Sequence, residues 1–129
     1  MDSPDYAIDV DVATRFLDDQ SAPEDGRYVF AYTIRIHNRG TMPARLISRH
    51  WRITDGDGRI QHVDGAGVIG KQPVLRPGAR FEYSSGCPLT TPSGMMQGAY
   101  RFEDETGASI EATIPLFALD SPYDERRPN

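Results

Sequence analysis

Hydrophobic and polar residues alternate along most of the chain, and a period of two is typical of β-strands with one buried face. The clearest run spans residues 28–36. Its predicted inward face carries a large apolar side chain at every second position: Tyr28, Phe30, Tyr32, Ile34 and Ile36. A shorter run near the start predicts a first strand whose apolar face is made of Tyr6, Ile8, Val10 and Val12.

Further runs predict the remaining strands. Residues 47–53 place three apolar side chains on one face: Ile47, Trp51 and Ile53. Residues 59–63 follow a turn at 55–58 whose Asp and Gly residues tolerate positive φ, which predicts a hairpin. Phe81 and Tyr83 mark the next strand. The last two strands are expected to form a hairpin around 103–107, with the apolar sets Met96, Gly98, Tyr100, Phe102 and Ile110, Ala112, Ile114, Leu116.

Two connections and a tail complete the expected organisation. Asp64 to Gly78 is rich in Gly and Pro and is long enough to be an ordered loop. Cys87 to Gly94 is expected to be a link with room for an edge segment. No stretch shows a helical period, which disfavours βαβ folds. We predict an all-β, immunoglobulin- or fibronectin type III-like β-sandwich of about seven or eight antiparallel strands, forming one domain over 1–119 before a disordered tail over 120–129.

Length, charge and cysteine content narrow the class of protein. The 129 residues suit one domain, which buries roughly two thirds of its unfolded surface. No apolar stretch approaches the roughly 18 residues of a membrane span. The first residues are acidic and polar, and Cys87 is the single cysteine, so we expect a cytoplasmic protein without a membrane partner. The net charge of −5 argues against a nucleic-acid partner.

Charge is distributed unevenly along the chain. Residues 41–80 carry seven cations and three anions, a local excess of four positive charges, whereas the remainder has seven cations and sixteen anions. A field of this kind steers an acidic partner toward the middle segment. Strand faces charged for solubility explain the same distribution equally well.

The most tempting chemical signature is the glycine run at 65–70. It matches G-x-G-x-x-G, and with Lys71 it matches the first seven positions of a P-loop. Both motifs hold phosphate where glycine amides converge with a helix N-terminus. Here Gln72-Pro73 follows, at the point where such a helix would begin. We therefore favour glycines that form a tight loop packed against a sheet.

A weaker form of the phosphate hypothesis stays open, because backbone amides can form an anion-binding nest without a nucleotide fold. Lys71 and Arg76 would then supply positive charge. The tentative ligand- or partner-binding residues are accordingly Gly65, Gly67, Gly70, Lys71 and Arg76.

Metal and catalytic motifs are weak. The three histidines and nearby aspartates have spacings that match neither a closed zinc site nor an EF-hand loop: His37, His50, His62, Asp55, Asp57 and Asp64. A weak, hydrated divalent-cation site stays open.

There is no G-x-S-x-G nucleophile motif, and Cys87 is followed at once by Pro88. We expect a protein that is not an enzyme, with no cofactor and no catalytic residues.

Several long gapped motifs resemble the bacterial ApaG family. They include the glycine run with Lys71-Gln72-Pro73, and they extend over most of the chain: His50-Trp51-x-Ile53-Thr54-Asp55, Leu75-x-Pro77-Gly78-x-x-Phe81-x-Tyr83-x-Ser85-Gly86-Cys87-x-Leu89, Gly94-x-Met96-x-Gly98-x-Tyr100-x-Phe102 and Ile114-Pro115-x-Phe117-x-Leu119. The resemblance implies a fibronectin type III-like sandwich in a cytoplasmic protein whose molecular activity is not established. Similar domains occur in a eukaryotic F-box protein and a polymerase delta-interacting protein. Bacterial relatives are associated with cobalt resistance and magnesium efflux.

Two functions are compatible with these features. The first is a non-catalytic module that binds a protein partner through a sheet face or the loop at 64–78, as a monomer or weak dimer. The second is a sensor that binds a polyphosphate nucleotide, pyrophosphate or a divalent cation at the glycine-rich loop.

Overall fold

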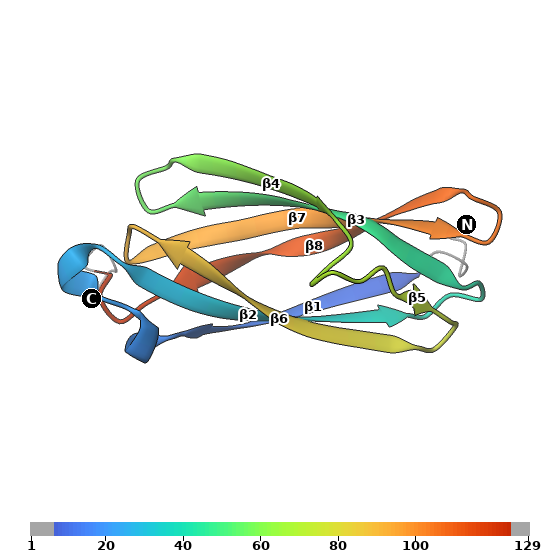
Figure 1. Ribbon diagram of the computed structural model, residues 1–129, viewed down its shortest axis with the longest axis horizontal. Helices are drawn as coiled ribbons and strands as arrows, with labels where there is room; N and C mark the ends of the chain where they lie inside the picture. Colours follow the sequence, from blue (N-terminus) through green and yellow to red (C-terminus); the bar gives the residue numbers. More distant parts are fainter. Residues whose placement is uncertain (1–6, 125–129) are drawn as a thin grey trace.

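The computed structural model describes residues 7–124, which fold as two antiparallel β-sheets packed face to face (Figure 1). The three-stranded sheet has the order β1-β2-β6, and the larger sheet has the order β4-β3-β7-β8, with β5 paired to β3. Two short 3-10 helices, η2 (Asp18–Gln20) and η3 (Pro23–Asp25), join β1 to β2. The strands are β1 (Ile8–Phe16), β2 (Tyr28–Asn38), β3 (Ala44–Asp55), β4 (Ile60–Ala66), β5 (Val74–Leu75), β6 (Arg80–Leu89), β7 (Ser93–Asp104) and β8 (Ser109–Asp120). The predicted all-β sandwich is confirmed.

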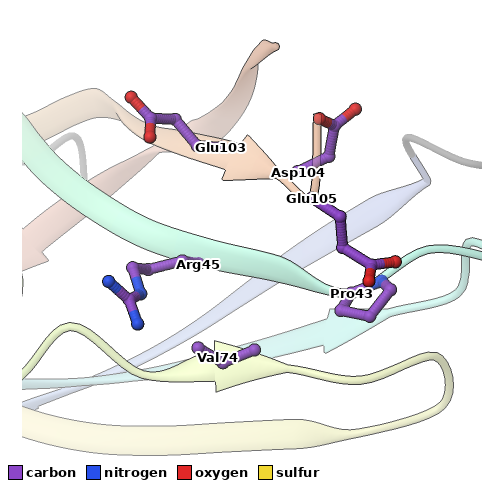
Figure 2. A pocket seen from close by; sticks show the side chains of 6 residues that line it. All are labelled: Pro43, Arg45, Val74, Glu103, Asp104 and Glu105. Carbon is purple, nitrogen blue, oxygen red and sulfur yellow. The ribbon is translucent and has the colours of Figure 1, made fainter. Parts of the chain in front are cut away.

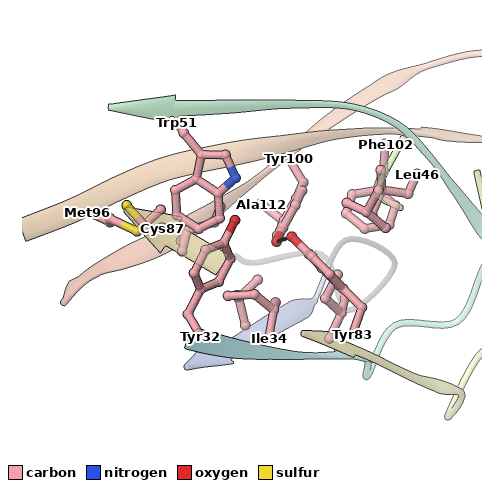
Figure 3. Packing of buried hydrophobic residues seen from close by; sticks show 14 of the residues in the cluster. Tyr32, Ile34, Leu46, Trp51, Tyr83, Cys87, Met96, Tyr100, Phe102 and Ala112 are labelled. Carbon is pink, nitrogen blue, oxygen red and sulfur yellow. Dashed lines mark hydrogen bonds between the residues drawn. The ribbon is translucent and has the colours of Figure 1, made fainter. Parts of the chain in front are cut away.

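The core lies between the two sheets and is rich in aromatic side chains (Figure 3). The predicted inward face of β2 is confirmed, because Phe30, Tyr32, Ile34 and Ile36 are all buried. Trp51 of β3 packs edge-to-face on Tyr32, with ring centroids 5.3 Å apart, so the indole joins the two sheets. Aromatic pairs in this geometry add stabilisation beyond the apolar area they bury.

A β-bulge corrects the predicted inward face of β3. The register with β7 shifts between Leu46 and Ser48, so Ile47 is an extra residue in β3. Ahead of the bulge Ala44 and Leu46 are buried, and beyond it Trp51 is buried. The predicted inward set for the start of this strand is thereby corrected, because Leu46 fills the core and Ile47 is only half-buried. A bulge moves every preceding side chain to the opposite face.

A second irregularity corrects the predicted inward face of β8. The register with β7 shifts between Met96 and Gly98, which leaves an extra residue in β8 near Pro115. Leu116, predicted to be buried, is 58% exposed, and Leu119 is buried in its place. Proline cannot donate to a ladder and is therefore found at bulges and edges.

The predicted long loop at 64–78 contains regular structure. Its first residues belong to β4, and β5 pairs with the start of β3 in the register Ala44↔Leu75. The predicted link at 87–94 is shorter than expected, because β6 continues to Leu89 and β7 begins at Ser93. These segments escaped prediction because their strand character comes from pairing and not from alternation.

Asn38 is a buried polar residue that joins three segments. Its Nδ2 donates to the carbonyls of Met42 and Leu75, both at 2.9 Å, and its Oδ1 accepts from the Gly40 amide at 2.9 Å. Every side-chain polar atom of this fully buried residue is therefore paired, which is the condition for burying it at little cost.

The tail predicted to be disordered from residue 120 begins with packed residues. Asp120 ends β8, and Ser121 is buried. The Tyr123 ring lies 5.9 Å from that of Phe16, edge-to-face. The rest of the predicted tail, residues 125–129, and Tyr6 of the predicted first strand lie outside the described residues.

Gly98 of β7 lies very close to the backbone of β3. A Cβ on Gly98 would lie 2.0 Å from the His50 carbonyl oxygen, which is a backbone atom that cannot rotate away. We expect Gly98→Ala to lower the free energy of unfolding by roughly 3 kcal/mol, because the two central strands must separate. Urea denaturation followed by circular dichroism measures this change.

Gly86→Ala is the matched control, since a Cβ there would meet only the Phe30 carbonyl oxygen at an ordinary 3.7 Å. Equal destabilisation by the two substitutions would show that the close approach at Gly98 does not constrain the sheet.

The hydroxyls of Tyr83 and Tyr100 form a hydrogen bond of 2.5 Å between the two sheets (Figure 3). Burial raises the pKa of Tyr83 from 10.0 to about 12 and raises the pKa of Tyr100 further, because ionisation would place a charge in the core. The folded-state pKa values of both tyrosines exceed their unfolded-state values. The two hydroxyls therefore contribute stability that is fully present below about pH 10, and this contribution is lost as the pH rises toward the folded-state pKa values.

We therefore expect the free energy of unfolding to fall between about pH 10 and pH 12, and to fall less steeply in the double variant Tyr83→Phe/Tyr100→Phe. Urea denaturation at a series of pH values tests this. Identical slopes for wild type and the double variant would contradict it.

Candidate functional site

The glycine run forms a tight β-hairpin turn. Val68 and Lys71 are paired as an isolated bridge, and each amide donates to the other's carbonyl at 2.8 Å. Between them Ile69 has φ 44° and Gly70 has φ 75°. Two consecutive residues with positive φ are typical of the type I′ turn that best fits the twist of a hairpin. No helix follows, and the chain continues into β5.

Arg49 explains why glycines precede this turn. Its Nη1 donates to the carbonyls of Ala66 at 3.2 Å and Gly67 at 2.8 Å. A Cβ on Gly65 would lie 2.7 Å from the guanidinium, and a Cβ on Gly67 would lie 2.1 Å from the Lys71 carbonyl oxygen. The glycines therefore make room for an arginine clamp and for a close backbone contact.

The structure brings together four of the five tentative binding residues. Gly65, Gly67, Gly70 and Lys71 all belong to the end of β4 and the hairpin turn, whereas Arg76 lies in a separate turn whose Ala79 amide donates to the Arg76 carbonyl at 2.8 Å. The amides of Gly67 and Lys71 donate to carbonyls within the chain, as does that of Val68. These amides are thus oriented toward the protein itself.

A groove of about 410 Å³ lies beside the hairpin, on the outer face of the five-stranded sheet. The sequence did not indicate it, because its lining comes from neighbouring positions on four strands and from the hairpin: Ile47, Ser48, Arg49, His50, Asp64, Gly65, Ala66, Gln72, Ala99, Tyr100, Arg101 and Glu111. Only Gly65 of the tentative binding residues is among them. The lining of the groove is mixed in charge, with arginines, a histidine and two carboxylates.

Ion pairs organise the polar side chains of this face. His50 Nδ1 lies 2.5 Å from Asp64 Oδ1, and the His62 ring is stacked on that of His50 with centroids 5.3 Å apart. Arg101 Nη1 donates to Glu103 Oε2 at 3.0 Å. All of these groups are strongly solvated, since the His50 and Asp64 side chains are 46% and 74% exposed.

The candidate metal ligands do not converge into one site. His50, His62 and Asp64 share the outer face of β3 and β4, whereas His37 lies on β2 in the other sheet. Asp55 Oδ1 accepts hydrogen bonds from the turn amides of Asp57 and Arg59. Among residues 7–124, no group of three or more His, Cys, Asp or Glu side chains is arranged to hold a metal ion.

A second, smaller groove of about 260 Å³ lies where β3, β5 and the end of β7 meet (Figure 2). Arg45 and Glu103 lie opposite each other in the β3–β7 register. The Asp104 carboxylate accepts hydrogen bonds from Thr106 and from the Ala108 amide, so it shapes the β7–β8 turn. The lining residues are Pro43, Arg45, Val74, Glu103, Asp104 and Glu105.

An exposed apolar row crosses the outer face of the five-stranded sheet, beyond the larger groove. In the strand registers Ile60 lies opposite Thr54, Thr54 lies opposite Met95, and Met95 lies opposite Ala118. Ile60 is 49% exposed, Met95 is 43% exposed, and Leu116 near the end of the row is 58% exposed. The row therefore spans all four long strands of the sheet.

Cys87 is buried in the core, and burial raises the pKa of its thiol to about 11. The thiol is consequently protonated at neutral pH, which disfavours a nucleophilic role. No helix within residues 7–124 has the length and apolar character needed to span a bilayer.

Comparison with known proteins places the chain in a family. The family model described as the ApaG domain matches residues 18–104. The chain is 60% identical over 121 residues to Protein ApaG of Stenotrophomonas maltophilia, covering 94% of this chain and 95% of the relative. It is 53% identical over 122 residues to Protein ApaG of Paramagnetospirillum magneticum, covering 95% and 94%.

Solved structures are also similar to this chain. The crystal structure of a protein from Bordetella pertussis described as putative ApaA is 50% identical, with a TM-score of 0.90 over 95% of this chain and 99% of that one. A C-terminal domain of wzt, 10% identical with a TM-score of 0.54, shares the fold alone. With the family model covering most of the sandwich and relatives matching nearly the whole chain, the protein belongs to the ApaG family.

Proposed function

We propose that this protein is a non-catalytic binding module that recognises a protein partner through the outer face of its five-stranded sheet. The observation that carries the proposal is the exposed apolar row of Ile60, Met95 and Leu116. Exposed apolar side chains that lie singly are ordinary, but several that gather on one face of a sheet and are bordered by polar groups are typical of a protein-binding surface.

The arrangement of this face suits a protein rather than a small molecule. Its apolar row follows the strand register across β4, β3, β7 and β8 and so extends along the surface of the sheet. The adjoining position on β3 is the exposed Arg52, which lies opposite His62 and Gln97. An apolar centre bordered by polar and charged groups matches the anatomy of protein interfaces.

The absence of catalysis is part of the proposal. The groove beside the row holds the exposed His50–Asp64 pair, and Cys87 is buried with a raised pKa. The relatives' names give family membership and indicate no reaction. Association with cobalt resistance and magnesium efflux stays an expectation from the family resemblance.

The alternative of a polyphosphate or cation sensor at the glycine-rich hairpin stays a prediction with less support. The amides of Gly67, Val68 and Lys71 already donate to internal carbonyls, so the hairpin offers fewer converging donors than a phosphate nest requires. Titration of the ¹⁵N-labelled protein with pyrophosphate tests it. Saturable shifts of the amide signals from Gly65 to Lys71, lost in Lys71→Ala, would promote this alternative.

Replacing the apolar row with charge tests the main proposal. We expect Met95→Glu/Leu116→Glu to weaken partner binding by at least tenfold, about 1.4 kcal/mol, because both side chains must be desolvated in the complex. Crosslinking and affinity purification from the native cell identify proteins retained by wild type. Titration calorimetry with the purified partner then measures the dissociation constant.

The matched control is Ala13→Glu/Ser84→Glu, which adds the same charge at exposed positions of the three-stranded sheet. It is expected to bind as wild type does. The proposal fails if the face variant and the control retain the same partners with equal affinity while both remain folded by circular dichroism.

A further inference from the structure

Strand β4 forms a free margin of the five-stranded sheet (Figure 1). Its ladder with β3 starts with the Asp55 amide bonded to the Arg59 carbonyl at 2.9 Å and ends with the Gly67 amide bonded to the Ile47 carbonyl at 2.8 Å. Hydrogen-bonded pairs alternate with non-hydrogen-bonded pairs in an antiparallel ladder. The odd-numbered residues of β4 therefore direct their backbone groups toward β3.

The even-numbered residues of β4 direct their backbone groups away from the sheet. They are Ile60, His62, Asp64 and Ala66, and their side chains share the outer face with His50. An edge strand of this kind offers a row of donors and acceptors to another strand. Native edge strands are usually blocked by charge or proline, and β4 contains no proline or lysine and one carboxylate, Asp64.

A second copy of β4 can pair with the first in a two-fold antiparallel ladder only in certain registers. Outward-directed groups must meet outward-directed groups, so a ladder that pairs at least five residues of β4 is centred on residue 62, 63 or 64. Centring on His62 places Ile60 opposite Asp64. Centring on Asp64 places two carboxylates opposite each other, which is destabilising.

Centring on Val63 gives complementary pairs throughout. His62 then lies opposite Asp64 of the second copy, and Ile60 lies opposite Ala66, each pair occurring twice by symmetry. On the inner face Val63 meets its own copy. A hydrogen bond from imidazole to carboxylate and an apolar pair across strands each stabilise a ladder.

We propose that two copies of this chain associate by antiparallel pairing of β4 about Val63, which joins their five-stranded sheets into one continuous sheet. The interaction uses the edge of the sheet, not the outer face proposed to bind a partner, so either can hold without the other. Its occupant is a second copy because the side chains of β4 are complementary to themselves, with imidazole opposite carboxylate and apolar opposite apolar.

Neighbouring groups are compatible with this pairing. His50 contacts one oxygen of the Asp64 carboxylate, which leaves the other oxygen to accept from the His62 imidazole of the second copy. Arg49 donates to the Ala66 carbonyl at 3.2 Å, and that carbonyl has a second lone pair for the Ile60 amide of the second copy. The other charged side chain beside His62 on this face is Arg52, its neighbour on β3.

Disulfide trapping tests the register. Val63→Cys places the two thiols at a non-hydrogen-bonded pair, where Cα atoms are about 4.5 Å apart and a disulfide forms readily. Gln61→Cys is the matched control on the same strand and face. In a ladder centred on Val63 the two introduced cysteines would be four residues apart along the strands, about 13 Å, which is too far for a disulfide. The native Cys87 is buried and serves as background.

We expect mild oxidation to crosslink Val63→Cys at least tenfold faster than Gln61→Cys or wild type. Equal rates for the two variants would overturn the proposed register.

A charge exchange tests the same pairing independently and without a crosslink. His62→Asp places carboxylates opposite each other, and Asp64→His places imidazoles opposite each other, so each is expected to weaken dimerisation at least tenfold in sedimentation equilibrium. The double variant His62→Asp/Asp64→His restores opposite pairs and is expected to return to within threefold of wild type.

Circular dichroism verifies that each variant is folded. Wild type that remains monomeric at millimolar concentration, or a double variant as weak as the single ones, would overturn the proposal.

Discussion

The contact between β3 and β7 at Gly98 constrains the geometry of the whole five-stranded sheet. The missing side chain lets the backbone of β7 approach the His50 carbonyl, and on the inner side Trp51 lies directly opposite Gly98 in the register. The indole is thereby held against Tyr32 of the facing sheet. Since β3 also pairs with β4 and β5, its position determines where the outer groove, the apolar row and the free edge lie.

Two bulges then decide which side chains face solvent. The extra residue in β3 turns Leu46 inward and orients Arg49 toward Gly65 and the hairpin. The extra residue in β8 leaves Leu116 outside and completes the apolar row. The two bulges therefore shape both the core and the proposed binding face, because each one interrupts the alternation of faces and shifts the residues beyond it to the other surface.

Most of the strands could be predicted because alternation is a local property of the sequence. The faces of Ile47 and Leu116 could not, because a bulge is a property of a pair of strands. β5 was missed for a similar reason, as two residues show no period and owe their strand geometry to β3. The tight loop expected from the glycine run is present as a hairpin turn, but its arginine clamp depends on the β3–β4 register. The apolar row likewise joins residues that only the β3–β7–β8 pairing brings together.

The outer face of the five-stranded sheet is the surface proposed to recognise a partner. Cross-saturation NMR tests this most directly, by transferring magnetisation from an unlabelled bound partner to the methyl groups of the labelled protein. The predicted result is strong transfer to Ile60, Met95 and Leu116, with little at the exposed Ile69 of the hairpin. Transfer concentrated at Ile69 or on the three-stranded sheet would contradict the account.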